Sequence, residues 1–392
     1  MKKWLVRCLI SVAGLALLSG CGGTITASVS WPGISVAKGA VYLGLGDRIY
    51  ALGAEEGKIL WNFAPENTHE FFFAAPTHAK DVLYVCSSGS AGGAIYALDA
   101  ESGAGKRLFP ERQKETKTFG ESLQRWLGTL FSPKGPVSFY ASPLVEGDAL
   151  YLGSTDRRVY ALEPETGAKL WEFTTGNWVW ATPVFSGSHL YVASMDHKIY
   201  CLDAKKGELK WTFEAGGAVA AAPAVAEGTL YFGAFDGKVY ALDAETGQER
   251  WTFALETPTT QKQNWVWGTP ATSGDKVYFG SLDHKVYALD SRTGKKLWDF
   301  ATGNVVCAAP LILEGTLYVA SGDGGVYALD AEAGKQKWAW KPAEEDEKNP
   351  PPIFSSPVSD GNRLYLVNME GKAFALNLED GTLVWSFTRP KE

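Results

Sequence analysis

Short runs of apolar and small residues alternate with turn residues along most of the chain, and the pattern is clearest between residues 219 and 253. Runs rich in β-branched, aromatic and small residues occupy 219–225, 229–234, 238–243 and 249–253. They are separated by Glu-Gly, Phe-Asp-Gly and Ala-Glu-Thr-Gly. Such runs are typical of strands and such separators of tight turns. The pattern therefore predicts four short antiparallel strands in this stretch.

The same unit recurs along the chain. Its anchor aromatic stands at Tyr50, Tyr96, Tyr160, Tyr200, Tyr240, Tyr287, Tyr327 and Phe374. A glycine follows seven residues after every anchor, and a tryptophan follows eleven residues after every anchor except the second, where Arg107 stands. Eight repeats of four strands predict an all-β fold, an eight-bladed β-propeller of four-stranded antiparallel blades. A seven-bladed ring without residues 82–109 is the alternative, because Arg107 makes the second unit the weakest match.

The recurring tryptophan has a physical role in such a fold. Neighbouring blades diverge away from the axis, and a large ring in each outer strand would fill the wedge between them. The spacing resembles the AxDxxTGxxxW docking signature of PQQ-type propellers, which Ala161 to Trp171 and Ala241 to Trp251 match well. The resemblance covers nearly the whole chain after residue 30. It implies structural docking residues at Trp61, Trp171, Trp211, Trp251, Trp298, Trp338 and Trp385.

The amino terminus has the pattern of a bacterial lipoprotein signal. Basic residues precede an apolar run from Cys8 to Leu18, which is too short to span a bilayer. The sequence Leu-Ser-Gly-Cys ending at Cys21 resembles a lipobox, whose cysteine receives the lipid. We therefore expect a signal peptide at 1–20, lipidation at Cys21, a tether at 21–29 and one propeller domain at 30–390.

Between the second and third units lies an insertion near 110–134. Phe119, Leu123, Trp126, Leu127 and Leu130 are spaced as one face of a helix. The insertion therefore predicts a short amphipathic helix that either covers the edge at Arg107 or binds a partner.

Charge and chemistry-bearing residues exclude several classes of function. Loss of residues 1–20 would take the formal charge from −7 to −10, which argues against binding nucleic acid. Cys86, Cys201 and Cys307 form neither a metal motif nor a disulfide framework. The recurrent aspartates Asp156, Asp196, Asp236, Asp283 and Asp323 are predicted to be turn residues rather than a metal ring. We expect no metal site.

The least ordinary feature of the sequence is a set of aromatic residues at the start of the inner strands. They are predicted to gather at one mouth of the central channel, where they either plug it or bind a peptide, a sugar or a planar group. The motif Asn-Trp-Val-Trp occurs twice, at 177–180 and 264–267. The candidate residues of this mouth are Phe73, Tyr140, Trp178, Trp180, Trp265, Trp267 and Phe354.

The resemblance to a known family says more about the function than the chemistry-bearing residues do. Eight such repeats behind a lipidated cysteine resemble the BamB family, which implies a non-catalytic, monomeric scaffold of the cell envelope. Its partners would be membrane lipid through Cys21 and a protein of outer-membrane β-barrel assembly. The alternative is an envelope lipoprotein that binds another ligand. A PQQ-dependent dehydrogenase would carry adjacent cysteines and a calcium site, and the chain has no adjacent cysteines. We therefore expect no catalytic residue and no bound PQQ.

Overall fold

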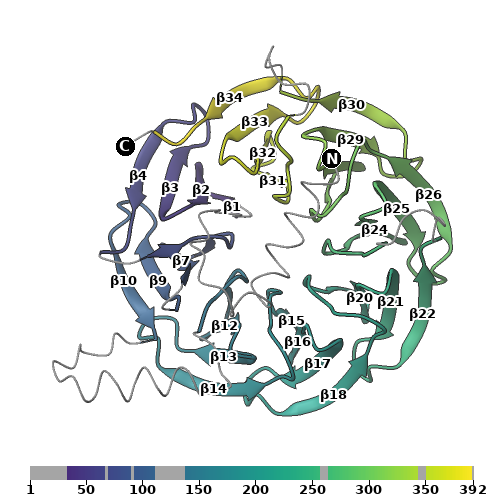
Figure 1. Ribbon diagram of the computed structural model, residues 1–392, viewed down its shortest axis with the longest axis horizontal. Helices are drawn as coiled ribbons and strands as arrows, with labels where there is room; N and C mark the ends of the chain where they lie inside the picture. Colours follow the sequence, from purple (N-terminus) through teal and green to yellow (C-terminus); the bar gives the residue numbers. More distant parts are fainter. Residues whose placement is uncertain are drawn as a thin grey trace, which may run out of the picture.

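The computed structural model describes residues 33–66, 69–89, 92–110, 137–256, 264–342 and 350–390. In this part of the chain, eight four-stranded antiparallel sheets are arranged around a central axis as the blades of a propeller (Figure 1). The first strand of each blade lies nearest the axis and the last at the rim. These residues contain no helix, and so none long and apolar enough to cross a membrane.

Each blade takes its four strands from one continuous stretch of chain, and the first three blades occupy residues 34–174. Blade 1 consists of β1 (Ile34–Ala37), β2 (Ala40–Leu45), β3 (Arg48–Gly53) and β4 (Ile59–Phe63). Blade 2 consists of β6 (Thr77–Ala79), β7 (Val82–Cys86), β9 (Ile95–Asp99) and β10 (Gly105–Phe109), with a separate pair of β5 (Glu70–Phe71) and β8 (Ser88–Gly89). Blade 3 consists of β11 (Leu144–Glu146), β12 (Ala149–Gly153), β13 (Arg158–Leu162) and β14 (Lys169–Thr174).

Blades 4 to 8 repeat this arrangement. Blade 4 consists of β15 (Val184–Ser186), β16 (His189–Ala193), β17 (Lys198–Asp203) and β18 (Leu209–Glu214). Blade 5 consists of β19 (Ala224–Ala226), β20 (Thr229–Gly233), β21 (Lys238–Asp243) and β22 (Glu249–Ala254). Blade 6 consists of β23 (Ala271–Ser273), β24 (Lys276–Gly280), β25 (Lys285–Asp290) and β26 (Lys296–Ala301). Blade 7 consists of β27 (Leu311–Leu313), β28 (Thr316–Ala320), β29 (Val326–Asp330) and β30 (Gln336–Trp340). Blade 8 consists of β31 (Val358–Ser359), β32 (Arg363–Val367), β33 (Ala373–Asn377) and β34 (Leu383–Phe387).

The hydrophobic core is divided among the junctions between neighbouring blades. Because successive side chains of a strand point to opposite faces, each middle strand supplies two junctions. In β20, Leu230 and Phe232 pack toward blade 4, whereas Tyr231 packs toward blade 6. This double burial explains why the middle strands are almost continuously apolar.

The ring closes by packing of blade 8 on blade 1. Trp385 donates a hydrogen bond from its indole Nε1 to the carbonyl oxygen of Ala54 at 2.8 Å, and the Tyr365 hydroxyl donates to the same oxygen at 3.2 Å. Within the described residues no four-stranded sheet combines strands from the two ends of the chain. Residues 82–109 supply three strands of blade 2 inside the ring, so the eight-bladed prediction is confirmed and the seven-bladed alternative is wrong.

The docking tryptophans bind the next blade in the same way at seven junctions. Each indole Nε1 donates to a backbone carbonyl oxygen at 2.8–3.2 Å. Each ring also lies against the glycine of the next blade that follows the anchor aromatic. At Gly103, an added Cβ would stand 2.5 Å from Cε3 of Trp61. The tryptophan of one blade and the glycine of the next therefore form a matched contact.

Blade 2 differs from this scheme in its outer strand. Lys106, and not Arg107, stands opposite Ala97, which is the place that Trp171 takes opposite Ala161 in blade 3. Buried Leu108 lies against Gly167 of the next blade, where other junctions have a tryptophan ring. The expectation that Arg107 replaces the docking tryptophan is wrong, because the bulge in β10 lies between Arg107 and Phe109 and shifts the register.

Two further expectations bear on segments near the blades. The inner strand predicted at 219–225 is wrong in extent, since β19 begins at Ala224. Val219 instead donates its backbone N–H to the Ser194 carbonyl oxygen of blade 4 at 3.2 Å. The helix predicted near 110–134 lies outside the described residues, apart from Pro110, as do residues 1–32 with Cys21.

Candidate functional site

The candidate aromatic residues lie in segments that lead from the outer strand of one blade to the inner strand of the next. Between β14 and β15, the Val179 N–H donates to Ser154 in blade 3 at 3.1 Å, and the Trp178 carbonyl oxygen accepts from Met195 in blade 4 at 2.9 Å. These bonds hold the segment between two blades. Val179 is buried, and Trp178 and Trp180 flank it as half-buried rings.

Equivalent segments follow the same rule at the other junctions. At seven junctions one residue of the segment is buried in the core, and the predicted ring positions are its neighbours in the sequence. The buried residues are Phe72, Phe139, Val179, Val219, Val266, Val306 and Ile353. Large rings flank this residue at some junctions, whereas Ala218 and Ala220 flank Val219 between blades 4 and 5. The rings are therefore distributed unevenly among the junctions.

Five rings from three consecutive junctions form a continuous series, called here the aromatic arc: Phe71, Phe73, Tyr140, Trp180 and Trp178. Ring centroids lie 6.3 Å apart for Phe71–Phe73, 5.4 Å for the stacked pair Phe73–Tyr140, 6.4 Å for Tyr140–Trp180 and 5.6 Å for Trp180–Trp178. All five are partly exposed, and Phe71 is the most exposed at 39%. The arc therefore presents linked ring surfaces to solvent.

A second group of rings lies at the junction of blades 5 and 6. Phe235, on the β20–β21 hairpin, stacks on Trp265 with centroids 4.5 Å apart and rings 6° from parallel. Its centroid is 4.9 Å from that of Trp267. Phe354 lies farther along the ring against Gly322 of blade 7. The structure thus places four predicted residues in the arc and two around Phe235.

Sequence reasoning missed Phe71 and Phe235. Phe71 stands two residues before Phe73, as Trp178 stands two before Trp180, so its spacing was a usable signal. Phe235 belongs to a hairpin rather than to the connecting segment, and its contact with Trp265 follows only from the packing of blade 5. The indole Nε1 of Trp180 is buried and has no hydrogen-bond partner among the described residues.

The recurrent aspartates are engaged by the protein itself. Asp156, Asp196, Asp236, Asp283 and Asp323 each accept a hydrogen bond on Oδ2 from the tyrosine hydroxyl four residues later, at 2.5–2.7 Å. In four of them Oδ1 accepts from the backbone N–H two residues later. Burial, followed by the Asp196 hydrogen bond, raises the pKa of Tyr200. The recurrent spacing of four residues between aspartate and tyrosine is a signal of this pairing in the sequence.

In blade 2 the equivalent tyrosine, Tyr96, pairs with a carboxylate from outside the four-stranded sheet. Glu70 of β5 is 6% exposed and accepts from the Tyr96 hydroxyl at 2.9 Å and from the Ser87 hydroxyl. Arg107 Nη1 donates to the other carboxylate oxygen of Glu70 at 2.9 Å. Arg107 is therefore the ion-pair partner of a buried carboxylate. In the described residues, no group of three or more histidine, cysteine, aspartate or glutamate side chains is placed to hold a metal.

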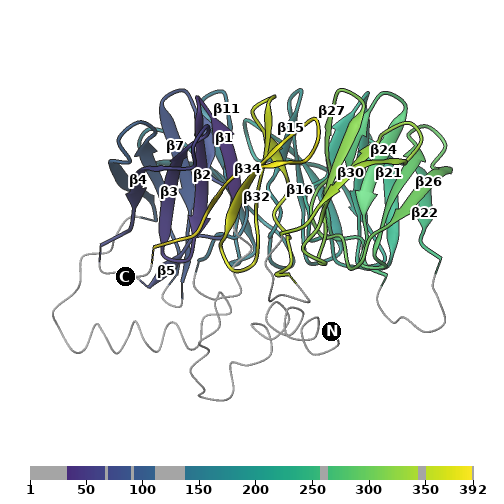
Figure 2. The ribbon, with the colours of Figure 1, turned by 90° about the horizontal axis from the view of Figure 1, so that it is seen from above.

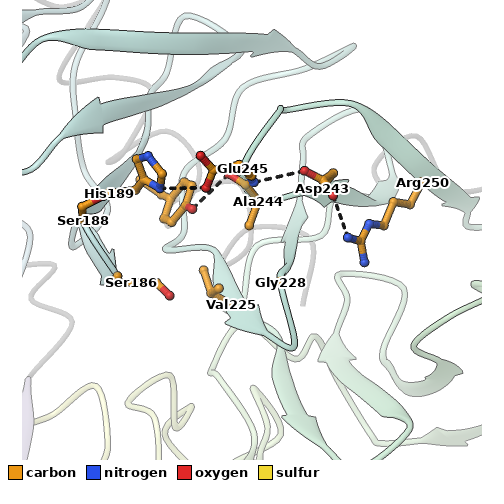
Figure 3. A pocket seen from close by; sticks show the side chains of 11 residues that line it. Ser186, Ser188, His189, Val225, Gly228, Asp243, Ala244, Glu245 and Arg250 are labelled. Carbon is orange, nitrogen blue, oxygen red and sulfur yellow. Dashed lines mark hydrogen bonds and ion pairs between the residues drawn. The ribbon is translucent and has the colours of Figure 1, made fainter.

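A cavity of about 370 Å³ lies between blades 4 and 5 (Figure 3). Ser186 at the end of β15 lines it, whereas Trp178 and Trp180 precede that strand in the chain. The cavity is lined by the β15–β16 hairpin with His189, and by Asp243, Glu245 and Arg250 of blade 5. His189 Nδ1 lies 3.6 Å from Glu245 Oε2, and Arg250 Nη2 lies 2.7 Å from Asp243 Oδ2. Seen at right angles to the view of Figure 1, the two ends of the blades form opposite faces of the ring (Figure 2).

Comparison with protein families gives one match. The model of the family described as "Outer membrane protein assembly factor BamB" matches residues 18–177, 155–264 and 235–391. Together these stretches span nearly the whole chain. A search of curated proteins found no match.

Solved structures share the fold at low sequence identity. BamB from Moraxella catarrhalis is 19% identical, with a TM-score of 0.64 over 87% of this chain and 92% of that one. A quinohemoprotein alcohol dehydrogenase from Pseudomonas putida HK5 is 15% identical, with a TM-score of 0.63 over 87% and 69%. A europium-containing methanol dehydrogenase is 15% identical, with a TM-score of 0.61 over 88% and 81%. At these identities the likeness shows the fold alone, which hosts binding proteins and enzymes alike.

Proposed function

The chain belongs to the family described as outer membrane protein assembly factor BamB, and from this membership we propose that it is a non-catalytic envelope scaffold that binds polypeptide during outer-membrane protein assembly. The observation that carries the proposal is the aromatic arc. Linked ring faces contribute large contact area with few rotatable bonds, which suits recognition of apolar and aromatic side chains of an extended chain.

The environment of Trp180 supports binding over a purely structural plug. Its indole Nε1 has no acceptor among the described residues, and a buried N–H left without an acceptor costs roughly 1–3 kcal/mol of stability. A ring that served only to fill the channel mouth would gain from losing that N–H. The partial exposure of the five arc residues supports the same interpretation, because a plug would bury them more completely.

The proposal includes an anchor on membrane lipid through acylated Cys21, on the extracytoplasmic side and at the outer membrane. The sequence pattern around Cys21 and the family membership support it. Replacement of Cys21 by serine should release the protein from membranes, and intact-mass measurement of the wild type should show acyl chains. Unchanged membrane association of the variant would refute the anchor.

The absence of catalysis is also part of the proposal. The hairpin carboxylates that an enzyme could use are bonded to tyrosine hydroxyls, and the chain has no adjacent cysteine pair. Purified protein mixed with PQQ and calcium should show no bound-quinone spectrum and no dye-linked oxidation of alcohols or sugars. A stoichiometric quinone complex with turnover would overturn this part.

The binding role is tested in cells by photo-crosslinking. A benzophenone amino acid at Tyr140 or at Trp180 should give adducts with a component of the outer-membrane assembly machinery or with its unfolded substrates. The matched control is the same amino acid at Leu209, which is 49% exposed on the rim of blade 4. Adducts of equal yield at all three positions, or none with an assembly component, would refute the role in assembly.

A further inference from the structure

The cavity between blades 4 and 5 has a counterpart with the same backbone frame between blades 6 and 7. His189 pairs across its hairpin with Ser186, as Lys276 pairs with Ser273. In both blades the next tyrosine of the same strand donates its hydroxyl to the alanine carbonyl oxygen of the following blade, at 3.0 Å and 3.2 Å. A glutamate follows that alanine in each case, Glu245 in blade 5 and Glu332 in blade 7.

The counterpart is occupied by an ammonium group of the protein itself. Lys276 Nζ lies 2.9 Å from Asp275 Oδ1 and 2.9 Å from Glu332 Oε2, and Lys276 is 9% exposed. Hydrogen bonds to Glu332 and Asp275 raise the pKa of Lys276, so its charge is stabilised there. The frame of this junction therefore binds a primary ammonium group.

The junction of blades 4 and 5 lacks that ammonium group. His189 stands at the place of Lys276 and Ser188 at the place of Asp275. The side chain of His189 is shorter than that of Lys276, and Ser188 supplies no carboxylate. The Nδ1 of His189 is 3.6 Å from Glu245 Oε2, and an imidazole balances a carboxylate only when it is protonated. The cavity of about 370 Å³ lies at this junction, where the close-up shows Ser188, His189 and Glu245 (Figure 3).

The cation already in the cavity is engaged elsewhere. Arg250 Nη2 lies 2.7 Å from Asp243 Oδ2, and its Nη1 donates to the Thr229 hydroxyl at 2.5 Å. The Arg250 hydrogen bond is the largest cause that lowers the pKa of Asp243 to about 2, so this pair is internally neutral. Among the ion pairs of the described residues, Glu245, whose side chain is 77% exposed, has only the 3.6 Å contact with His189 Nδ1.

We propose that this cavity is a binding site for a primary ammonium group such as that of a lysine side chain. The ammonium group takes the place that Lys276 Nζ fills at the other junction and pairs with Glu245. The serine hydroxyls of the β15–β16 hairpin offer further acceptors, since an ammonium group has three donors. The site is distinct from the aromatic arc and does not depend on the function proposed for it.

The site is tested with N-acetyl-lysine amide as the probe and N-acetyl-norleucine amide as the uncharged control. The chain without its signal peptide is titrated and followed by NMR of the His189 ring and of the Glu245 backbone amide. We expect saturable shifts with the lysine probe alone. Equal shifts with the norleucine compound, or none with either, would overturn the proposal.

Variants identify the cavity as the place of binding. H189K should fill the cavity as Lys276 does, and E245Q should remove the carboxylate, so each should weaken the lysine probe on the order of tenfold or more. K276H is the matched gain-of-site variant and should add a second site that shifts the Glu332 amide. Far-UV circular dichroism verifies folding. A folded H189K that keeps wild-type affinity would refute the assignment.

Discussion

The contact between a docking tryptophan and the glycine of the next blade leads to a quantitative prediction at Gly294. This glycine has φ of +69°, and a Cβ added there would stand 2.6 Å from Cε3 and 2.7 Å from Cδ2 of Trp251. Carbon atoms prefer separations of about 3.5–4.0 Å, so the indole would have to move by about 1 Å. That movement would also stretch the 2.8 Å hydrogen bond from Trp251 to Ser291.

Two contributions add up in Gly294→Ala. A non-glycine residue in the left-handed region lowers the free energy of unfolding by about 1–2 kcal/mol, and overpacking against a fixed ring lowers it by about 1–3 kcal/mol more. The matched control is Gly315→Ala, because Gly315 has φ of +72° and an added Cβ would meet nothing within 4 Å. We expect destabilisation of about 2–5 kcal/mol for Gly294→Ala and about 1–2 kcal/mol for Gly315→Ala.

The assay is urea denaturation followed by far-UV circular dichroism, which does not depend on the fluorescence of the tryptophan removed. A double-mutant cycle isolates the contact, since Gly294→Ala in a Trp251→Ala background should lose only the backbone contribution. The two single changes should therefore be less than additive by about 1–3 kcal/mol. Equal losses at Gly294 and Gly315, or strict additivity of the cycle, would refute the matched-contact argument.

Three further predictions concern other parts of the ring. Arg107→Ala should destabilise by about 3–5 kcal/mol, because it leaves the carboxylate of buried Glu70 without its cation; thermal unfolding measures this, and a loss below 1 kcal/mol would contradict it. Trp180→Ala and Trp267→Ala should each weaken capture of an unfolded β-barrel polypeptide while changing the melting temperature little, whereas a fall in melting temperature with unchanged capture would favour a plug. Burial raises the pKa of Cys201 to about 12, so a disulfide reagent at pH 8 should leave this thiol unmodified in the folded protein and modify it in urea, which peptide mass analysis resolves.

The fold was predictable because its units repeat. Every blade carries the same anchor aromatic, turn glycine and outer-strand tryptophan or its substitute, so errors in one unit are corrected by the others. The contact between a glycine and the tryptophan of the preceding blade was not predictable from the repeat. A turn with positive φ is a sufficient reason for a glycine at position 294, so nothing in the sequence indicates that the Trp251 ring also packs against it.

Blade 2 shows where sequence reasoning fails. Counting from Tyr96 assigns Arg107 to the docking position, but the bulge of β10 comes after Arg107, whereas that of blade 3 comes before Trp171, so Lys106 stands opposite Ala97. The partner of Arg107 is Glu70, which lies 37 residues earlier in a strand outside the four-stranded blade. Position in the repeat carries no information about such long-range partners.

The candidate site was predicted in part for the same reason. The repeat position identified the rings of the connecting segments, including Tyr140 and Trp180. It did not show that rings of neighbouring junctions touch, because contact depends on how far each blade is rotated from the next. Phe235 escaped detection since it reaches Trp265 from a hairpin, where large side chains serve no common role in the other blades.

Closure of the ring without a shared strand has a consequence for biosynthesis. Blades 1 to 7 can each form from a finished stretch of chain as it leaves the ribosome, and each new blade can pack on the one before it. The face of blade 1 that receives Trp385 must wait, because that tryptophan is 331 residues farther along the chain than Ala54. An apolar face therefore remains uncovered until synthesis is nearly complete, and the growing chain depends on that interval being short or on another protein shielding it.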